Sequence, residues 1–385
     1  MSKIKVIIGI FSFVLMLTNP QMVYEAAVFA IETWWNNVIP ALLPFFIVSE
    51  FLMAVGLMEC LAVWLEPVMR PLFRLSGGSA LAIVMGFVSG TPTAANITAN
   101  LYKNRLCSKD EAERLLAFTN NSGPLYILVA VAVGIFQNPA VGIILFLSHY
   151  PINFCLGIIL RFFAQDKRKR ENIFPSVNII SMGFNIIKCC QSPPLGRLLN
   201  IVVKKSLMNI GVVGGFMVVF GILTASFDIA GITGLLSALL TPLALLFNID
   251  ASCLPAMAAG FWEMTIGIAV LPQSGADMLS MLLASSIILA WNGVSIQSQV
   301  AAMVADTDLK LNKYRICRII HSLTAPLVIL FMYKKTAPVF AVCSPDAVNF
   351  LSFITPFSLL LLSLIMLALT GLLGIIIFKR KNRNY

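Results

Sequence analysis

An apolar stretch from Leu115 to Leu128 is interrupted in its middle by Thr119-Asn120-Asn121-Ser122-Gly123-Pro124. Inside a lipid bilayer no water bonds to free backbone N–H and C=O groups. A broken helix is therefore tolerated there only where protein buries the break or a wet cavity faces it. A second break lies in Trp291 to Gln299, again between apolar residues. Two interrupted segments in corresponding positions of two halves are typical of a transporter binding site.

The composition also places the chain in a membrane. Hydrophobic residues make up 59% of the 385 residues and charged residues 11%, whereas soluble domains contain roughly 25% charged residues. The net charge of +10 does not indicate nucleic-acid binding, because the basic residues form short clusters between apolar runs, as topology signals do. The eight cysteines are scattered and predict neither a disulfide framework nor a metal site.

No sequence pattern points to an enzyme. A phosphate-binding loop of the type Gly-x-x-x-x-Gly-Lys is absent, which argues against an ATP-driven pump. No catalytic or metal-ligand cluster is recognisable either. We therefore expect an integral, multi-pass membrane protein without enzymatic activity and without a cofactor.

The alternation of apolar and polar segments predicts an all-α polytopic protein made of two related halves. In residues 77–102 and 251–271, small or polar residues divide an apolar stretch into flanks shorter than the roughly 20 residues of a spanning helix. We expect both to form re-entrant hairpins. The predicted units are an N-terminal transmembrane helix with an exposed connection over 21–37 (1–39), a first repeat (40–163), a cytoplasmic or interfacial linker (164–205), a second, inverted repeat (206–333) and a C-terminal transmembrane helix with a basic tail (334–385).

Three landmarks recur at a nearly constant spacing and support the duplication. Gly86-Phe87 precedes Gly260-Phe261 by 174 residues, and Ala117-Phe118 precedes Ala290-Trp291 by 173 residues. The only two histidines, His149 and His321, are 172 residues apart. Transporters are often built from such repeats.

Charged clusters predict that the two halves are inverted. We place residues 103–114, 167–170 and 306–318 in the cytoplasm together with both termini. The chain between each two of these segments then crosses the membrane and returns, in agreement with the predicted spans. The two hairpins then enter the membrane from opposite faces, as an inverted repeat requires.

Hydroxyl and amide side chains cluster at the hairpin turns and at the helix breaks. Half-helix N-termini at such breaks attract carboxylates, although small polar residues also hold membrane helices together without further function. We expect Asn121 and Ser122 to face Ser295 and Gln297 across a shared cavity near the midplane. The predicted substrate-binding residues are Ser89, Thr91, Thr93, Asn120, Asn121, Ser122, Gly123, Asn292, Ser295, Gln297 and Gln299.

Three ionisable residues in the predicted membrane region are candidates for ion coupling. Glu263 lies in the break of the second hairpin. Burying an acid at this depth costs free energy, so such a residue indicates a function. His149 and His321 could carry protons or could be structural, hydrogen-bonded histidines. Glu50 lies within an apolar run and could be solvated at the interface. Whether the coupling ion is H⁺ or Na⁺ stays open.

Several of these motifs resemble the YlbJ (SpoVV) family of sporulation integral membrane proteins of endospore-forming Firmicutes. The resemblance covers roughly residues 40–333. Its most specific part is Asn120-Asn121-Ser122-Gly123-Pro124. The other matching motifs are Gly86-Phe87-Val88-Ser89-Gly90-Thr91-Pro92, His149-Tyr150, Glu263-Met264-Thr265 and Gln299-Val300. The resemblance implies paired Gate, or nucleoside-recognition, domains and an architecture similar to that of concentrative nucleoside transporters.

The same resemblance implies a function in sporulation. The expected role is to move a small organic anion, dipicolinic acid, from the mother cell across the outer forespore membrane. The expected partners are this anion, the lipid bilayer and a further copy of the chain in a homo-oligomer. Two alternatives stay open: a non-transporting membrane scaffold for assembly of the spore envelope, and a nucleoside transporter. A scaffold has no need of broken helices, so the breaks favour transport.

Overall fold

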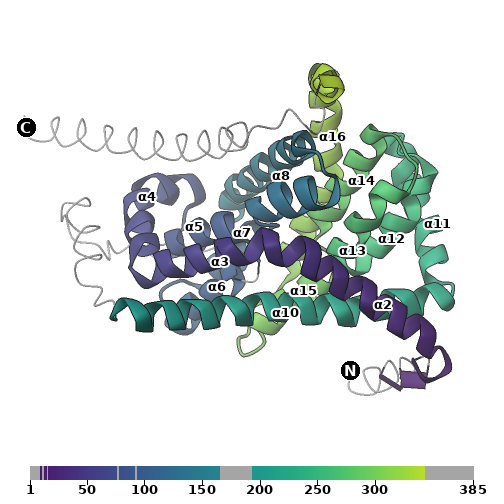
Figure 1. Ribbon diagram of the computed structural model, residues 1–385. Helices are drawn as coiled ribbons and strands as arrows, with labels where there is room; N and C mark the ends of the chain where they lie inside the picture. The colour runs from purple at the N-terminus through teal and green to yellow at the C-terminus, as the bar shows by residue number, and fades with distance from the viewer. Residues whose placement is uncertain are drawn as a thin grey trace, which may run out of the picture.

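The part of the chain that the computed structural model describes consists of helices and their connections (Figure 1). It comprises residues 9–342 except 11–12, 15, 76–77, 92 and 165–192. Five helical segments within it are long and apolar enough to cross a membrane, namely Pro20–Ala54, Pro139–Phe163, Leu195–Ile229, Met278–Met303 and Asn312–Tyr333. The predicted all-α polytopic class is confirmed. The predicted C-terminal helix and basic tail over 343–385, the linker residues 165–192 and the first eight residues lie outside the described residues.

Two long helical segments lie side by side along one side of the molecule (Figure 1). The first runs without interruption through α2 (Pro20–Thr33), the π-helix η1 (Trp34–Val38) and α3 (Ile39–Ala54), and the second is α10 (Leu195–Ile229). Each contains 35 residues and is therefore about 52 Å long, more than the roughly 30 Å of the hydrocarbon core. The ends of both segments can therefore extend into the interfaces.

Two predicted connections differ from the structure. Residues 21–37 are helical rather than an exposed connection. Pro40 lacks an N–H group, and the helix accommodates it by widening into η1 instead of ending. Similarly, residues 195–205 of the predicted linker form the first turns of α10.

Specific contacts join the two long segments. The indole Nε1 of Trp34 donates to the carbonyl oxygen of Ile210 at 3.1 Å. The ring of Trp34 occupies space left free by Gly214, where a Cβ would lie 2.5 Å from the ring. Glu50 is buried and binds Lys205 at 2.6 Å and Asn209 at 3.2 Å. Glu50 is thus an ion-pair partner within a helix interface rather than a solvated surface acid.

The remaining helices follow one order twice: a short helix, a hairpin, a broken helix and a continuous helix. The helices of the first repeat lie mainly to the left in Figure 1, and α11 to α14 lie to the right. The first set is α4 (Leu57–Phe73), α5 (Ser79–Ser89), α6 (Thr93–Lys103), α7 (Lys109–Thr119), η2 (Tyr126–Ile135), α8 (Pro139–Leu160) and η3 (Arg161–Phe163). The second is α11 (Ile232–Phe247), η4 (Ala251–Cys253), α12 (Leu254–Trp262), α13 (Met264–Val270), η5 (Leu271–Gln273), α14 (Met278–Trp291), α15 (Gly293–Met303) and α16 (Asn312–Val342).

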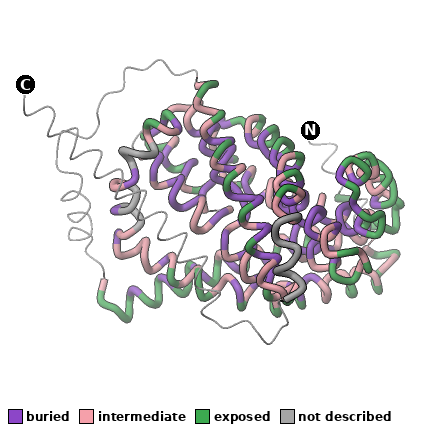
Figure 2. The backbone as a smooth tube through the Cα atoms, turned by 90° about the horizontal axis from the view of Figure 1, so that it is seen from above, coloured by how far each residue is buried: buried purple, intermediate pink, exposed green. Residues whose placement is uncertain are grey.

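The broken helices form the interior of the molecule, and the long pair lies outside. Buried residues make up 72% of the most apolar window of Met278–Met303, but only 17% of that of Pro20–Ala54 (Figure 2). A spanning segment surrounded by protein can contain polar groups that lipid would not tolerate. The polar breaks therefore lie where protein can satisfy them.

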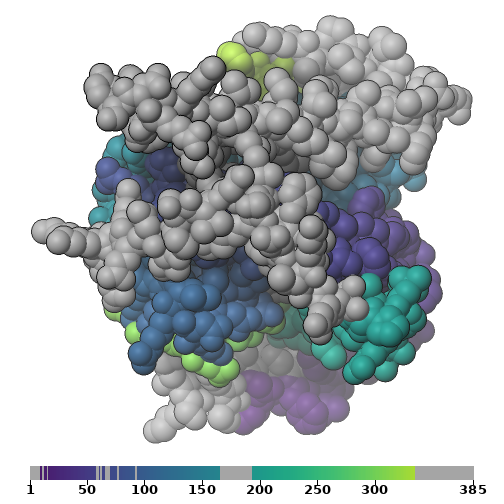
Figure 3. All heavy atoms as spheres, turned by 90° about the vertical axis from the view of Figure 1, so that its left-hand side faces the viewer, coloured from purple at the N-terminus to yellow at the C-terminus, as the bar shows by residue number. Residues whose placement is uncertain are grey.

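Two charged stretches that were predicted to share one side of the membrane are in direct contact. Lys109 binds Asp308 at 2.6 Å, Lys103 binds Asp306 at 3.5 Å, and the hydroxyl of Tyr102 donates to Asp308 at 2.6 Å. Figure 3 looks onto this side, where yellow-green atoms of the second repeat border blue atoms of the first. Hydrogen bonds from Lys109 and Tyr102 lower the pKa of Asp308. Its carboxylate is therefore charged at neutral pH.

A deeper ion pair at this side gives a first prediction. Asp110 binds the buried guanidinium of Arg114 at 2.9 Å and Lys313 at 2.7 Å. Asp110→Asn should destabilise the protein by roughly 3 kcal/mol, because it leaves a buried cation without its counter-charge. Thermal unfolding of the purified protein in detergent measures this effect. Asp308→Asn, at an exposed pair, is the control and should change the unfolding midpoint much less; equal shifts would contradict the prediction.

The opposite orientation of the hairpins gives a second prediction. Asn104 follows the first hairpin and Gln273 follows the second, and both are exposed. In a cysteine-free protein, single cysteines at these two positions should be labelled by an impermeant thiol reagent from opposite sides of the membrane. Labelling of both from the same side would exclude an inverted repeat.

Candidate functional site

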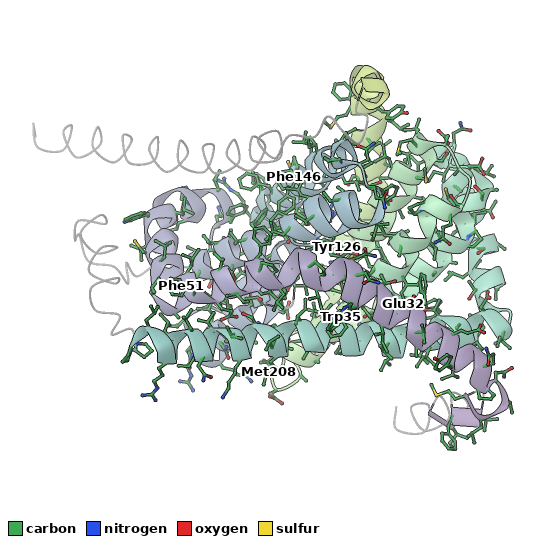
Figure 4. The ribbon with its side chains drawn as sticks, in the orientation of Figure 1. Glu32, Trp35, Phe51, Tyr126, Phe146 and Met208 are labelled. Atoms are coloured by element: carbon green, nitrogen blue, oxygen red, sulfur yellow. The ribbon has the colours of Figure 1, made fainter. Side chains whose placement is uncertain are left out.

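The first helix break is capped by its own side chains. Helix α7 ends at Thr119, and the side chains of Thr119 and Asn120 donate to the carbonyl oxygens of Leu115 and Leu116 at 2.7 and 3.0 Å. Pro124 lacks an N–H group and is suited to the first turn of a helix, so the helix resumes at Pro124 and continues as η2. Figure 4 shows Tyr126, the first residue of η2, in the middle of the molecule, whereas Met208 on α10 points away from it.

The second helix break is made by backbone conformation. Asn292 and Gly293 have φ angles of 68° and 64°, in the left-handed region that asparagine and glycine adopt most readily. This geometry ends α14 and starts α15 in a new direction. The side chain of Gln297 reaches back and donates to the carbonyl oxygen of Trp291 at 3.2 Å. A carbonyl group released by the break is thereby satisfied.

Each hairpin turn packs against the break of its own repeat. In the first repeat a Cβ on Gly90 would lie 2.7 Å from the backbone nitrogen of Gly123, and Thr91 donates to the carbonyl oxygen of Asn121. In the second repeat a Cβ on Gly293 would lie 2.9 Å from the backbone nitrogen of Met264. The same close approach of backbone to backbone thus occurs twice.

The two repeats meet at Ser122. Its hydroxyl lies 3.3 Å from the side-chain oxygen of Asn292 and 3.3 Å from the sulfur of Met264 in the second hairpin. Tyr150 on α8 donates to the carbonyl oxygen of Ser122 at 3.0 Å. Asn292 also donates to the carbonyl oxygen of Asn120 at 3.1 Å. Both breaks and the second hairpin therefore converge on one buried polar centre.

The amides of Asn121 and Gln297, which were expected to face a shared cavity, each bind backbone of their own repeat. In the orientation that satisfies its amide, Asn121 donates to the carbonyl oxygens of Thr119 and Gly86, both at 3.1 Å. The contact between repeats runs through Ser122 and Asn292 instead. Carbonyl groups left without a helical partner at the breaks accept hydrogen bonds from the nearest side-chain amides.

The other predicted binding residues differ in their burial and in their contacts. Ser295 and Gln299 are buried on α15, and Thr93 begins α6. The hydroxyl of Ser89 lies 3.2 Å from that of Ser49 on α3. Among the described residues, the hydroxyl of Ser295 and the side-chain oxygen of Asn120 have no hydrogen-bond partner. These two atoms are free to bind a ligand or water.

Glu263 lies at the turn of the second hairpin and is 2% exposed. Its carboxylate accepts a hydrogen bond from the backbone N–H of Ile266 at 2.7 Å and so caps the N-terminus of α13. A capping carboxylate is a structural role in its own right. Coupling through Glu263 stays a prediction.

The two histidines are in contact, with ring centroids 4.4 Å apart. They come from α8 and α16, which pack against each other. The site also contains a residue that the sequence analysis missed. Arg318 was assigned to a cytoplasmic charged stretch, but it is fully buried beside His321. The spacing of three residues places both on one face of a helix and could have revealed the pair.

Asn292 gives a third prediction. Asn292→Ala removes hydrogen bonds to Ser122, Asn120 and Tyr314 and should lower the unfolding free energy by about 2 to 4 kcal/mol. Asn292→Gly removes the same bonds but keeps the left-handed conformation, and should be about 1 kcal/mol less damaging. Chemical or thermal unfolding in detergent measures both. Wild-type stability of the alanine variant would refute the role of this bridge.

Comparison with known proteins agrees with this architecture. The Gate family profile, described as nucleoside recognition, matches residues 35–163, which correspond to the first repeat. The chain is 34% identical over 344 residues to the sporulation integral membrane protein YlbJ of Bacillus subtilis (strain 168), an alignment that covers 87% of this chain and 84% of that protein. The chain belongs to the YlbJ family of sporulation integral membrane proteins.

The fold of this YlbJ-family protein is that of a concentrative nucleoside transporter. The structure of CNTnw in an inward-facing substrate-bound state superposes with a TM-score of 0.52 at 13% sequence identity. The superposition covers 86% of this chain and 84% of CNTnw. At this level of identity the similarity establishes the shared fold.

Proposed function

We propose that this YlbJ-family protein is a secondary transporter of a small organic anion, dipicolinate, and moves it from the mother cell across the outer forespore membrane. The observation that carries the proposal is the meeting of two helix breaks at Ser122 and Asn292. Broken helices cost backbone hydrogen bonds inside a membrane. A protein that only holds other proteins in place would gain nothing from this cost.

The chemistry of the site suits a carboxylate ligand. The helix η2 and the helix α15 both begin at the breaks, and the backbone N–H groups of a first helical turn carry partial positive charge. Side-chain donors of Ser122, Asn292 and Ser295 lie in the same buried region. A charge-assisted hydrogen bond to a carboxylate contributes roughly 1.5 to 3 kcal/mol.

Nucleoside transport is the second candidate. It is favoured by the description of the Gate profile and by the fold shared with CNTnw. Neutral nucleosides would require only hydrogen bonds, whereas dipicolinate carries two carboxylates. Competition between the two ligands therefore separates the candidates.

Uptake into vesicles that contain only this protein tests the proposal. Labelled dipicolinate should enter these proteoliposomes faster than protein-free vesicles, and unlabelled dipicolinate should compete while uridine should not. Accumulation driven by an imposed proton or sodium gradient identifies the coupling ion. Uptake of uridine without uptake of dipicolinate would support the nucleoside candidate, and no uptake of either would favour a scaffold.

A further inference from the structure

Two arginines of the described chain are almost completely buried, and they differ in their partners. Arg114 is 2% exposed and has a full set: the carboxylate of Asp110 at 2.9 Å and the carbonyl oxygens of Phe73 and Arg74 at 2.9 and 3.0 Å. Arg318 is 0% exposed, and no carboxylate among the described residues pairs with it. A buried guanidinium without a counter-charge is costly.

The contacts of Arg318 within the described residues do not use all of its N–H donors. One terminal nitrogen binds the side-chain oxygen of Asn153 at 2.6 Å and the carbonyl oxygen of Ala117 at 3.2 Å. The other lies 3.4 Å from Nδ1 of His321. The Nε–H group has no partner in the described part of the chain.

The two histidines next to Arg318 add further unmatched nitrogens. If Nδ1 of His321 accepts from Arg318, the proton of a neutral ring lies on Nε2, and this Nε2 has no partner among the residues described. Neither ring nitrogen of His149 has a hydrogen-bond partner in the described part of the chain, and the residue is only 1% exposed. One of these two nitrogens carries a proton in the neutral ring. The cluster thus holds at least three N–H donors that have no acceptor among the described residues, beside a fixed positive charge.

We propose that Arg318, His149 and His321 form a binding site for a carboxylate group of the transported anion. A carboxylate supplies what this cluster lacks, namely two oxygens that accept hydrogen bonds and a negative charge that matches the guanidinium. This proposal rests on the proposed transport of an organic anion and names the residues that select its charge.

One residue, Tyr314, connects the cluster with the second helix break. Arg318 stacks over the ring of Tyr314 at 5.6 Å, and the hydroxyl of Tyr314 accepts a hydrogen bond from Asn292 at 3.4 Å. A ligand of two carboxylates could therefore place one against Arg318 and direct the other toward the half-helix N-termini at the breaks. Such a geometry favours dicarboxylates over monocarboxylates.

A purely structural role is the competing explanation. The bond to Ala117 satisfies a carbonyl group in the last turn of α7, where a positive charge is favourable. In that case Arg318 would stabilise α7 but would not contribute to anion binding. The two explanations differ in the ligand dependence of the effect.

The test measures binding to the purified full-length protein in detergent through ligand-dependent shifts of the thermal unfolding midpoint. The panel is dipicolinate, picolinate with one carboxylate, neutral dipicolinamide and a set of other small mono- and dicarboxylates. In the wild type, dipicolinate should bind more tightly than picolinate, and dipicolinamide should bind weakest. Arg318→Gln should weaken dipicolinate binding at least tenfold and should remove most of the preference for charge.

Matched variants keep the result interpretable. Arg315→Gln removes the same charge one helical turn away at an exposed position and should leave the dissociation constant within twofold of wild type. His149→Phe keeps an aromatic ring, removes no hydrogen bond seen in the described residues, and should weaken dipicolinate binding about tenfold. If Arg318→Gln does not fold, this variant decides the matter.

Each outcome has one consequence. The inference is overturned if Arg318→Gln lowers the stability but binds dipicolinate with a dissociation constant within twofold of wild type. Where Arg318→Gln does not fold, the same affinity measured for His149→Phe overturns it. It is also overturned if no carboxylate binds the wild type. Suppose instead that another carboxylate binds the wild type, dipicolinate does not, and Arg318→Gln or His149→Phe abolishes that binding. The site then stands, and the substrate of the proposed function is the part that fails.

Discussion

Gly267→Ala should prevent the second hairpin from closing. A Cβ at this position would lie 2.3 Å from the Cα and 2.4 Å from the nitrogen of Gly260, and 2.7 Å from the carbonyl oxygen of Ala256. All three are backbone atoms, so no side-chain rotation can relieve the overlap, and α12 and α13 would have to separate. We expect a loss of more than about 4 kcal/mol of stability, a value that few single substitutions reach.

The yield of folded protein and the thermal unfolding midpoint in detergent measure this effect. Gly215→Ala is the matched control, because a Cβ on this exposed residue of α10 meets nothing within 4 Å. Alanine should be neutral there or should stabilise the helix by about 0.5 to 1 kcal/mol. A normal midpoint for Gly267→Ala would mean that the hairpin helices do not approach each other as described.

Glu263→Gln should abolish accumulation of dipicolinate in proteoliposomes, provided that Glu263 binds the coupling ion. Glutamine keeps the side-chain oxygen that caps Ile266, but it can neither carry a proton nor neutralise a cation. The variant should therefore fold normally and lose at least tenfold in uptake against a concentration gradient. Initial uptake in an imposed ion gradient, normalised to the amount of inserted protein, is the measurement.

The control for this variant is Glu32→Gln, which removes an exposed acid from α2. Its uptake should remain near that of wild type. Undiminished accumulation by Glu263→Gln would leave this residue with its structural role as the cap of α13. Loss of folded Glu263→Gln protein would instead assign it a larger structural role than one hydrogen bond.

The positions of the breaks could be predicted from sequence because they depend on local chemistry. Pro124, Gly123 and Asn292 impose or permit backbone conformations that end a helix wherever they occur. The course of residues 21–37 could not be predicted in this way. Glu25, Glu32 and two asparagines lower the apolar character of this segment, and its helix is stabilised by packing against α10.

The burial of Arg318 could not be predicted from the local sequence, for a related reason. A basic residue at the edge of an apolar run usually marks the membrane surface, and Lys310, Lys313 and Arg315 follow that rule. Arg318 does not, because Asn153 and Ala117 come from α8 and α7 and enclose it. Such long-range contacts are absent from the local pattern. The same limit applies to Asn121, whose amide orientation depends on the carbonyl oxygen of Gly86 in the hairpin.

The contact between His149 and His321 has a geometric consequence for how the molecule changes shape. The two residues are equivalent in the two halves, so a pair that touches must lie on the pseudo-two-fold axis that relates the halves. In an inverted repeat, the opposite state arises when each half adopts the conformation of the other. When the two halves exchange conformations, contacts away from the axis are replaced by others. The pair of His149 and His321 lies on the axis, so it is exchanged only with itself. If the protein transports as proposed, the two imidazole rings should keep their separation while access alternates between the two faces of the membrane.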